Sequence, residues 1–264
     1  MKVNVCGINV EYIDQGSGVP IILMHGNPDR AQSWEPVINE IGNGVRIIAP
    51  DFPGFGQSDP LPKGFNLLPQ GMAQFWDDFI NALNINESIV ICVHDFGGSW
   101  LLPWVAANPH RVRGLLIMNT MFHQDFKWHF WARVWQIPLL GELSMLLMNR
   151  PLAHYEMSKA SPGLSKSIIN KTYESMNKVM QKTVLRCYRA YKNPQQVFKE
   201  WEEKLELAIK KIPTRVIWGD QDPYVQKSFA DRFGVEATHL PGHGHWVYMT
   251  QPNLVANTLK ELAQ

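Results

Sequence analysis

The pattern of hydrophobic and polar positions divides the first half of the chain into alternating strand-like and helix-like segments. Residues 1–5 and 8–13 predict a hairpin. Short apolar runs typical of buried strands follow at residues 21–24, 45–49, 89–93 and 112–118. Residues 70–83 space their apolar groups as a helix does, and another helix is expected from near Ser33. This alternation predicts a mostly parallel sheet with crossover helices.

The pattern changes after residue 121. From there to about residue 211 the apolar spacing is helical, interrupted only by proline and glycine. Strands are predicted again at residues 215–218 and 236–240, with helices near 225–233 and from about 252. The first half and the end of the chain therefore share one pattern, and the middle has another.

This division indicates an insertion within one domain. We expect an α/β core made of residues 1–121 and 212–264, with residues 122–211 inserted as a helical cap, or lid. The length of 264 residues is within reach of one α/β domain with an insertion. The apolar fraction of 45% supports a packed core.

The charge and the absence of targeting motifs predict neither a nucleic-acid nor a membrane partner. The formal net charge of +1 gives no electrostatic case for nucleic acid or acidic membranes as partners. No apolar run approaches the roughly 18 residues that span a bilayer, and the N-terminus shows no signal-peptide core. We expect a cytoplasmic protein, either a monomer or a small homo-oligomer.

Metal and cofactor chemistry has little support. Three cysteines (Cys6, Cys92 and Cys187) are too few and too scattered for a disulfide framework or a thiolate metal site. His243 and His245 are spaced as a metal-binding pair, but no third ligand is near them. We expect neither a metal nor an organic cofactor.

Three loops that follow predicted strands carry the residues of a catalytic triad. Residues 93–98 read Val-His-Asp-Phe-Gly-Gly and fit the nucleophile elbow, with Asp95 at the nucleophile position. Asp95 as an ordinary helix N-cap is the structural alternative. Residues 218–223 supply an acid and residues 242–246 a histidine, in the chain order of nucleophile, acid and base.

The chain resembles the α/β-hydrolase superfamily, and within it the branch of haloalkane dehalogenases and epoxide hydrolases. The matching residues are His-Gly-Asn-Pro at 25–28, Asp-Phe-Pro-Gly-Phe-Gly-Gln-Ser-Asp at 51–59, the Asp95 elbow, Asp222 and His245. This resemblance implies an α/β-hydrolase fold with a lid. It also implies Asp95 as nucleophile, Asp222 as acid and His245 as base.

Other residues compete for two of these roles. Asp220 is the alternative acid beside Asp222, and Asp125 is the nearest carboxylate after the strand at 112–118, where some relatives carry the acid. His243 is the alternative base. Of the remaining histidines, His25 is expected to be structural, while His94 and His123 are expected to pack or to line a wall.

An aspartate at the elbow predicts alkyl rather than acyl transfer. The carboxylate attacks saturated carbon and forms an ester, whose carbonyl carbon is then attacked by water that His245 activates. The backbone N–H groups of Phe96 and Asn27 are expected to bind the oxyanion. The expected substrate is a small apolar organic molecule, with water as second reactant.

The leaving group is less well specified. The resemblance assigns the Asn27 amide to halide, yet Phe96 stands where dehalogenases usually carry an indole donor. A substitute indole can come from Trp34, Trp100, Trp128, Trp131 or Trp135. Epoxide opening instead needs hydroxyl donors, for which Tyr155, Tyr173, Tyr188 and Tyr191 are available. We therefore rank haloalkane dehalogenation first, epoxide hydrolysis second, then a lactone substrate, and last a catalytically silent binding protein.

Overall fold

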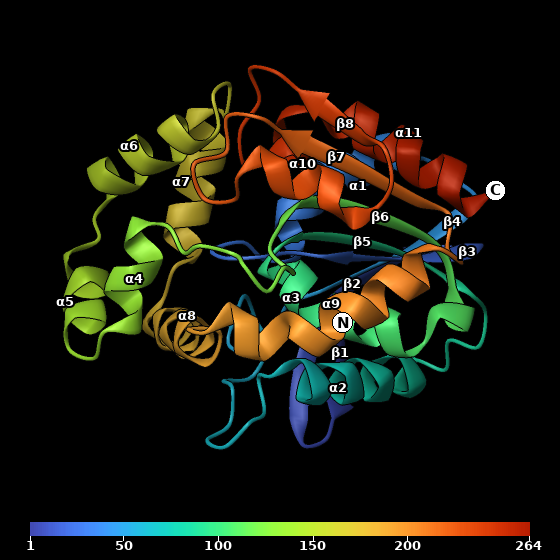
Figure 1. The fold of residues 1–264 in the computed structure, drawn as a ribbon, viewed down its shortest axis with the longest axis horizontal. Helices are drawn as coiled ribbons and strands as arrows, with labels where there is room; N and C mark the ends of the chain where they lie inside the picture. Colours follow the sequence, from blue (N-terminus) through green and yellow to red (C-terminus); the bar gives the residue numbers. More distant parts are fainter.

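The computed structural model describes residues 1–264 and contains one eight-stranded sheet (Figure 1). The strands are β1 (Lys2–Val5), β2 (Ile8–Gly16), β3 (Val19–Met24), β4 (Val45–Pro50), β5 (Ile89–Asp95), β6 (Val112–Thr120), β7 (Thr214–Gly219) and β8 (Ala237–Leu240). They lie in the order β1-β2-β4-β3-β5-β6-β7-β8. Only the pairs β1–β2 and β2–β4 are antiparallel. The expected mostly parallel sheet is confirmed.

Helices cover both faces of this sheet. On one face lie α1 (Glu35–Ile41) and α11 (Pro252–Ala263), which contact each other. On the other face, α3 (Phe96–Ala107) packs between α2 (Pro69–Ala82) and α9 (Pro194–Ile209). Alternate residues of β5 belong to separate apolar clusters on the two faces, as the pleat of a doubly covered strand requires.

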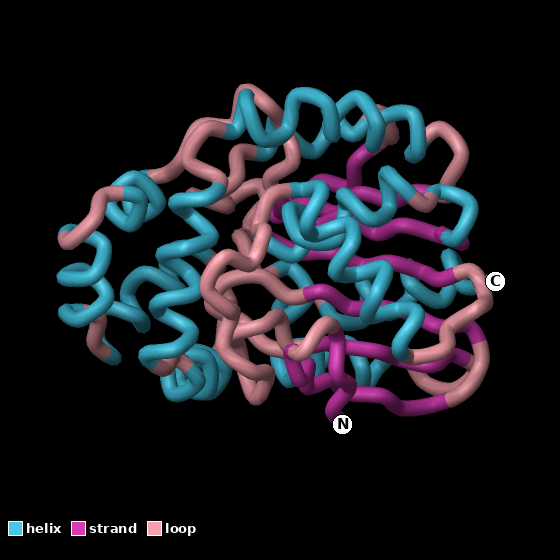
Figure 2. Tube along the Cα trace, turned by 90° about the horizontal axis from the view of Figure 1, so that it is seen from below, coloured by secondary structure: helices cyan, strands magenta, loops and turns pink.

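Every regular element between β6 and β7 is a helix. These are α4 (Phe130–Gln136), α5 (Leu140–Leu147), α6 (Arg150–Ala160), α7 (Lys166–Ser175), α8 (Lys178–Ala190) and α9. The first five gather beyond one end of the strands, as Figure 2 shows, whereas α9 runs along the sheet against α3. The division into a core (1–121 and 212–264) and a cap (122–211) stays a prediction.

The helices in this segment begin where the sequence supplies a cap. Asn149, Ser165 and Asn177 each accept a backbone N–H of the following helix on a side-chain oxygen. Pro151 and Pro194 stand in the first turns of α6 and α9, where a missing N–H has no cost. Local chemistry therefore explains how the chain divides this long helical stretch.

Two of the expected helices are tighter than α-helices. The segment predicted near 225–233 is a 3₁₀ helix at Lys227–Phe233, and the helix expected near Ser33 begins as a 3₁₀ turn, Ala31–Trp34. One short helix, α10 (Val247–Thr250), was not expected. None of the helices is both long and apolar enough to cross a bilayer.

Candidate active site

Asp95 occupies a sharp turn between β5 and α3. Its backbone has φ 51° and ψ −128°, a conformation that a side chain adopts at a cost. Small neighbours make the turn possible: a Cβ on Gly26 would collide with Asp95, and one on Gly97 would lie 2.6 Å from the carbonyl oxygen of Met24. The Asp95 side chain makes no capping hydrogen bond to α3. The ordinary N-cap interpretation is therefore wrong.

The structure brings Asp95, His245 and Asp222 together from three loops. His245 Nε2 lies 3.5 Å from Asp95 Oδ2, and His245 Nδ1 lies 2.7 Å from Asp222 Oδ2. All three side chains are buried. Asp95 Oδ1 accepts the backbone N–H of Asn27 at 2.7 Å, which leaves Oδ2 directed toward the histidine.

Asp222 is fixed by hydrogen bonds to both carboxylate oxygens. The backbone N–H groups of Tyr224 and Val225 donate to Oδ1 at 2.7 and 3.1 Å. Asn119, at the end of β6, donates its side-chain amide to Oδ2 at 2.8 Å. Asn119 was not among the residues predicted for the site, although it follows the strand after which some relatives carry the acid. That position was the available signal.

The charges of this group follow from its burial and contacts. Burial opposes an imidazolium, but the carboxylates of Asp222 and Asp95 outweigh it and raise the pKa of His245 to about 10. Burial also favours a neutral Asp95, yet contact with His245 and the Asn27 N–H hold the pKa of Asp95 below its ordinary value. At neutral pH the resting pair is thus a carboxylate facing an imidazolium.

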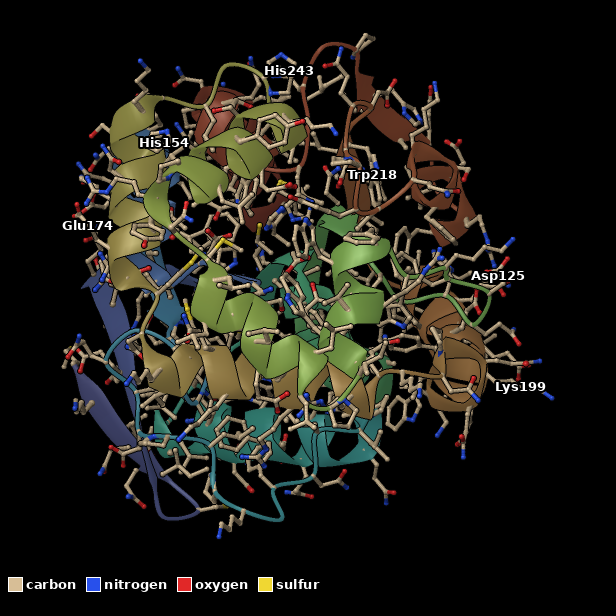
Figure 3. All side chains as sticks on the ribbon, turned by 90° about the vertical axis from the view of Figure 1, so that its left-hand side faces the viewer. Asp125, His154, Glu174, Lys199, Trp218 and His243 are labelled. Atoms are coloured by element: carbon tan, nitrogen blue, oxygen red, sulfur yellow. The ribbon has the colours of Figure 1, made fainter.

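The competing acids are engaged elsewhere. Asp220 Oδ1 pairs with His239 Nδ1 at 2.6 Å. Asp125 forms an ion pair with Arg232 at the surface and lies at the edge of the molecule in Figure 3. Neither carboxylate contacts His245, so of the three carboxylates considered only Asp222 pairs with this imidazole.

The competing histidines have other partners as well. His243 lies 3.3 Å from the hydroxyl of Thr250 and is seen at the periphery in Figure 3. His25 accepts the backbone N–H of Phe52 at 3.0 Å, which fits its expected structural role. His123 pairs with a glutamate of α9 at 2.7 Å.

A second buried polar layer lies behind His245. His94 Nε2 is 2.9 Å from the backbone oxygen of His245; a carbonyl only accepts, so Nε2 carries the proton. Burial lowers the pKa of His94 to about 3 and raises that of the nearby Asp29 carboxyl to about 7. Asp29 accepts the indole N–H of Trp246 at 2.9 Å. His94 therefore contacts the catalytic loop directly, which the sequence did not indicate.

Asp95 and His245 open onto a cavity of about 100 Å³ beneath the helices α4 to α8. Its opposite wall is mainly apolar. That wall includes Trp131, Trp135, Met145, Met148, Met176 and Met180. Methionine side chains are unbranched and adapt to irregular shapes, so this wall suits a small apolar molecule without dictating one outline.

Besides Asp95, His245 and Asn27, polar side chains on the cavity wall come from His129, Glu156, Gln181, Tyr188 and Tyr224. The Tyr188 hydroxyl lies 3.4 Å from His129 Nε2, and burial raises the pKa of Tyr188 well above its ordinary value. Tyr224 meets the His245 ring edge-on, with centroids 5.2 Å apart. Tyr188 was among the four tyrosines proposed from sequence. His129 and Tyr224 were missed, although Tyr224 stands two residues after Asp222.

Only some of the residues proposed from sequence to bind the leaving group line the cavity. Asn27 lines the cavity, whereas the side chain of Phe96 packs against Trp100 and other core aromatics and is not part of the cavity wall. The backbone N–H of Phe96 begins α3. Trp131 and Trp135 line the cavity, and the Trp135 Nε1 is buried without a partner.

The other candidate side chains point elsewhere. Trp34 and Trp100 lie in the core, and Trp128 Nε1 donates to a backbone oxygen of the chain at 3.0 Å. Tyr191 donates its hydroxyl to a backbone oxygen at 2.6 Å, and Tyr155 is largely exposed on α6. Tyr173 is not part of the cavity wall.

The chain is similar in sequence to several known proteins. A lactone decarboxylase of Shewanella oneidensis, named cis-3-alkyl-4-alkyloxetan-2-one decarboxylase, is 27% identical over 91% of this chain and 80% of its own length. Epoxide hydrolase 3 of Xenopus tropicalis is 26% identical over 97% of this chain and 74% of its own. A haloalkane dehalogenase of Sphingobium indicum is 31% identical over 45% of this chain and 41% of its own.

A solved structure shows the same fold. The Cif epoxide hydrolase of Acinetobacter nosocomialis superposes with a TM-score of 0.83 at 19% identity, over 99% of this chain and 88% of its own. The model of the alpha/beta hydrolase family matches residues 21–258, which run from β3 into α11 and leave out the first two strands. The resemblance to haloalkane dehalogenases and epoxide hydrolases is confirmed, and the chain belongs to the alpha/beta hydrolase family.

Proposed function

We propose that the protein hydrolyses a small apolar substrate through a covalent alkyl ester on Asp95, with haloalkane dehalogenation as the first candidate reaction. One observation carries the proposal: Asp95 Oδ2 faces His245 Nε2 at 3.5 Å beside a mostly apolar cavity. The oxygen held by the Asn27 N–H is tied in place, so Oδ2 is the free nucleophile.

In the first step the Asp95 carboxylate attacks a saturated carbon of the substrate. The new C–O bond forms as the carbon–halogen bond breaks, and the halide leaves with the bonding electron pair. The lowered pKa of Asp95 keeps the nucleophile ionised at neutral pH. The Asn27 amide and the unpartnered Trp135 N–H are the halide donors we assign, in place of the missing indole at position 96.

In the second step water attacks the ester carbonyl carbon. Formation of the ester removes the Asp95 charge, one of two carboxylates that hold the proton on His245. The pKa of His245 therefore falls, the proton is released with the halide, and the neutral imidazole takes a proton from water. The Asn27 N–H already contacts Oδ1, where the oxyanion forms. His245 then returns its proton to the departing alcohol.

Epoxide hydrolysis is the second candidate, because a phenol faces the cavity. His129 Nδ1 accepts the backbone N–H of Ala132, and burial lowers the pKa of His129 to about 4, so its proton sits on Nε2. Nε2 can then donate to Tyr188, whose own O–H is left to protonate an alkoxide. Halide release needs no proton, whereas ring opening does.

Trapping the ester tests both candidates. The variant His245→Phe is expected to form the ester without hydrolysing it. We would incubate it with short bromoalkanes and short epoxides and record its intact mass. An alkyl adduct supports dehalogenation, and a hydroxyalkyl adduct supports epoxide opening.

The matched control is the double variant Asp95→Ala/His245→Phe, which must stay unmodified. Adding Tyr188→Phe to the trapping variant is expected to slow the epoxide adduct by about 100-fold and to leave the bromoalkane adduct unchanged. A trapping variant that acquires no adduct from either class would contradict the covalent proposal.

A further inference from the structure

Six large apolar side chains are exposed on α4, on α5 and in the connection between them. We call Phe130, Ile137, Leu139, Leu143, Leu146 and Leu147 the lid patch; each is at least half exposed. Seven of the twelve exposed large apolar side chains of the whole chain fall within residues 130–147. These two helices lie at the outer end of the molecule, farthest from the sheet, and face the viewer in Figure 3.

Packing inside the protein does not account for this exposure. The opposite face of α5 already lies against the cavity through Met145, so the helix is apolar on both sides. An exposed cluster of this kind marks a surface that meets another apolar phase.

The charges of the segment that contains the lid patch indicate which kind of apolar surface it meets. Residues 122–193 carry eleven Lys or Arg and only four Asp or Glu, a net charge of +7. The rest of the chain therefore carries −6, and the net charge of +1 for the whole protein conceals this separation. Six lysines of this segment are exposed and make no ion pair: Lys127, Lys159, Lys166, Lys178, Lys182 and Lys192.

Three of these lysines belong to segments that adjoin α4 and α5. Lys127 precedes α4 by three residues. Lys178 and Lys182 lie in the first turns of α8, which packs against both α4 and α5. Exposed apolar side chains in a segment of positive net charge are the pattern by which amphipathic helices lie in the headgroup region of an anionic bilayer.

We propose that the lid patch docks on an anionic lipid bilayer. A second copy of the chain fits less well, because a two-fold contact through this face would bring two cationic surfaces together. The same helices supply Trp131, Trp135, Met145 and Met148 to the cavity wall. A docked lid therefore places the cavity beside the bilayer, where apolar molecules concentrate. The proposal is independent of the reaction assigned to Asp95.

Vesicle binding tests this proposal. The full chain is expected to float with vesicles of phosphatidylcholine mixed with phosphatidylglycerol, and to bind pure phosphatidylcholine far less. Raising the salt concentration is expected to weaken the binding, since screening reduces the attraction. The double variants Leu146→Gln/Leu147→Gln and Lys178→Gln/Lys182→Gln are each expected to lower the partition coefficient by roughly ten-fold.

Matched variants on other surfaces serve as controls. Leu68→Gln/Leu207→Gln removes two exposed leucines and Lys199→Gln/Lys211→Gln removes two exposed lysines, all outside α4 to α8. Both are expected to bind as the unmodified protein does. Absence of binding to the anionic vesicles, or equal loss in the control variants, would overturn the proposal. The proposal would also be overturned if the protein binds no vesicles and light scattering detects a dimer that Leu146→Gln/Leu147→Gln dissociates.

Discussion

The two walls of the cavity are built in different ways. The wall on the sheet side carries Asp95 and His245 on short loops, and the carboxylate and imidazole atoms of these two residues each have a partner at a defined distance. The wall on the lid side consists largely of methionine and tryptophan on separate helices. One wall fixes atoms for a reaction, whereas the other encloses a volume. Changes on the sheet side should therefore alter rates, and changes on the lid side should alter which molecules fit.

The largest expected effect comes from removing a charge on the sheet side. Asp222→Asn should slow hydrolysis of the ester by about 10³- to 10⁴-fold, because the histidine loses the carboxylate that orients it. The ester should then accumulate in the first turnover. A burst of halide release without a matching release of alcohol would show this, as would the adduct in the intact mass. Asp220→Asn is the matched control and should change the rate less than about two-fold, since Asp220 contacts His239 instead. An equal loss in both steps would contradict the role of Asp222.

A smaller effect is expected in stability, from the buried layer behind His245. The raised pKa of Asp29, about 7, means that the folded protein holds this proton and the unfolded chain releases it near pH 4. Stability contributed by the neutral carboxyl is therefore complete below about pH 4 and is lost as the pH rises to about 7.

The variant Asp29→Asn removes this dependence and keeps an oxygen for the Trp246 N–H. Its free energy of unfolding, relative to the unmodified protein, should rise by about 2–4 kcal/mol between pH 4 and pH 7. Above pH 7 the difference should stay constant. Chemical denaturation across this range measures it, and parallel pH profiles for the two proteins would rule out a buried titrating Asp29.

The smallest effect is expected on the lid side. Met176→Ala should change kcat/KM for the best substrate by less than about five-fold, because neighbouring methionines can move into part of the space. The value of kcat/KM for substrates longer by one or two carbons should increase relative to that for short substrates. A panel of substrates of graded chain length measures this ratio. A loss as large as that of Asp222→Asn would show that the lid also fixes reacting atoms.

The sequence predicted one of these walls far better than the other. The elbow, the acid and the base could be located because strained turns and strand ends require particular residue types, such as the glycines around Asp95. The partners of those residues were harder to find. Asn119 and His94 act through contacts with residues more than 100 positions away, which no local pattern encodes.

The segment between β6 and β7 could be predicted only as a set of helices. Its helix starts follow from capping residues such as Asn149 and Asn177. Which face of each helix meets the cavity depends on how the helices pack together. Methionine and leucine are equally suited to either face, so the sequence did not indicate that Met145 lines the cavity while Leu146 is exposed.

The contact between Asn119 and Asp222 also bears on how such enzymes change over evolutionary time. Asparagine and aspartate codons differ by one base, and the two side chains here touch across neighbouring strands at 2.8 Å. Asn119→Asp would place two carboxyl groups that share one proton beside the same imidazole. A later change of Asp222 to asparagine would complete the exchange. Each step of this exchange leaves at least one carboxyl group in the pair formed by positions 119 and 222.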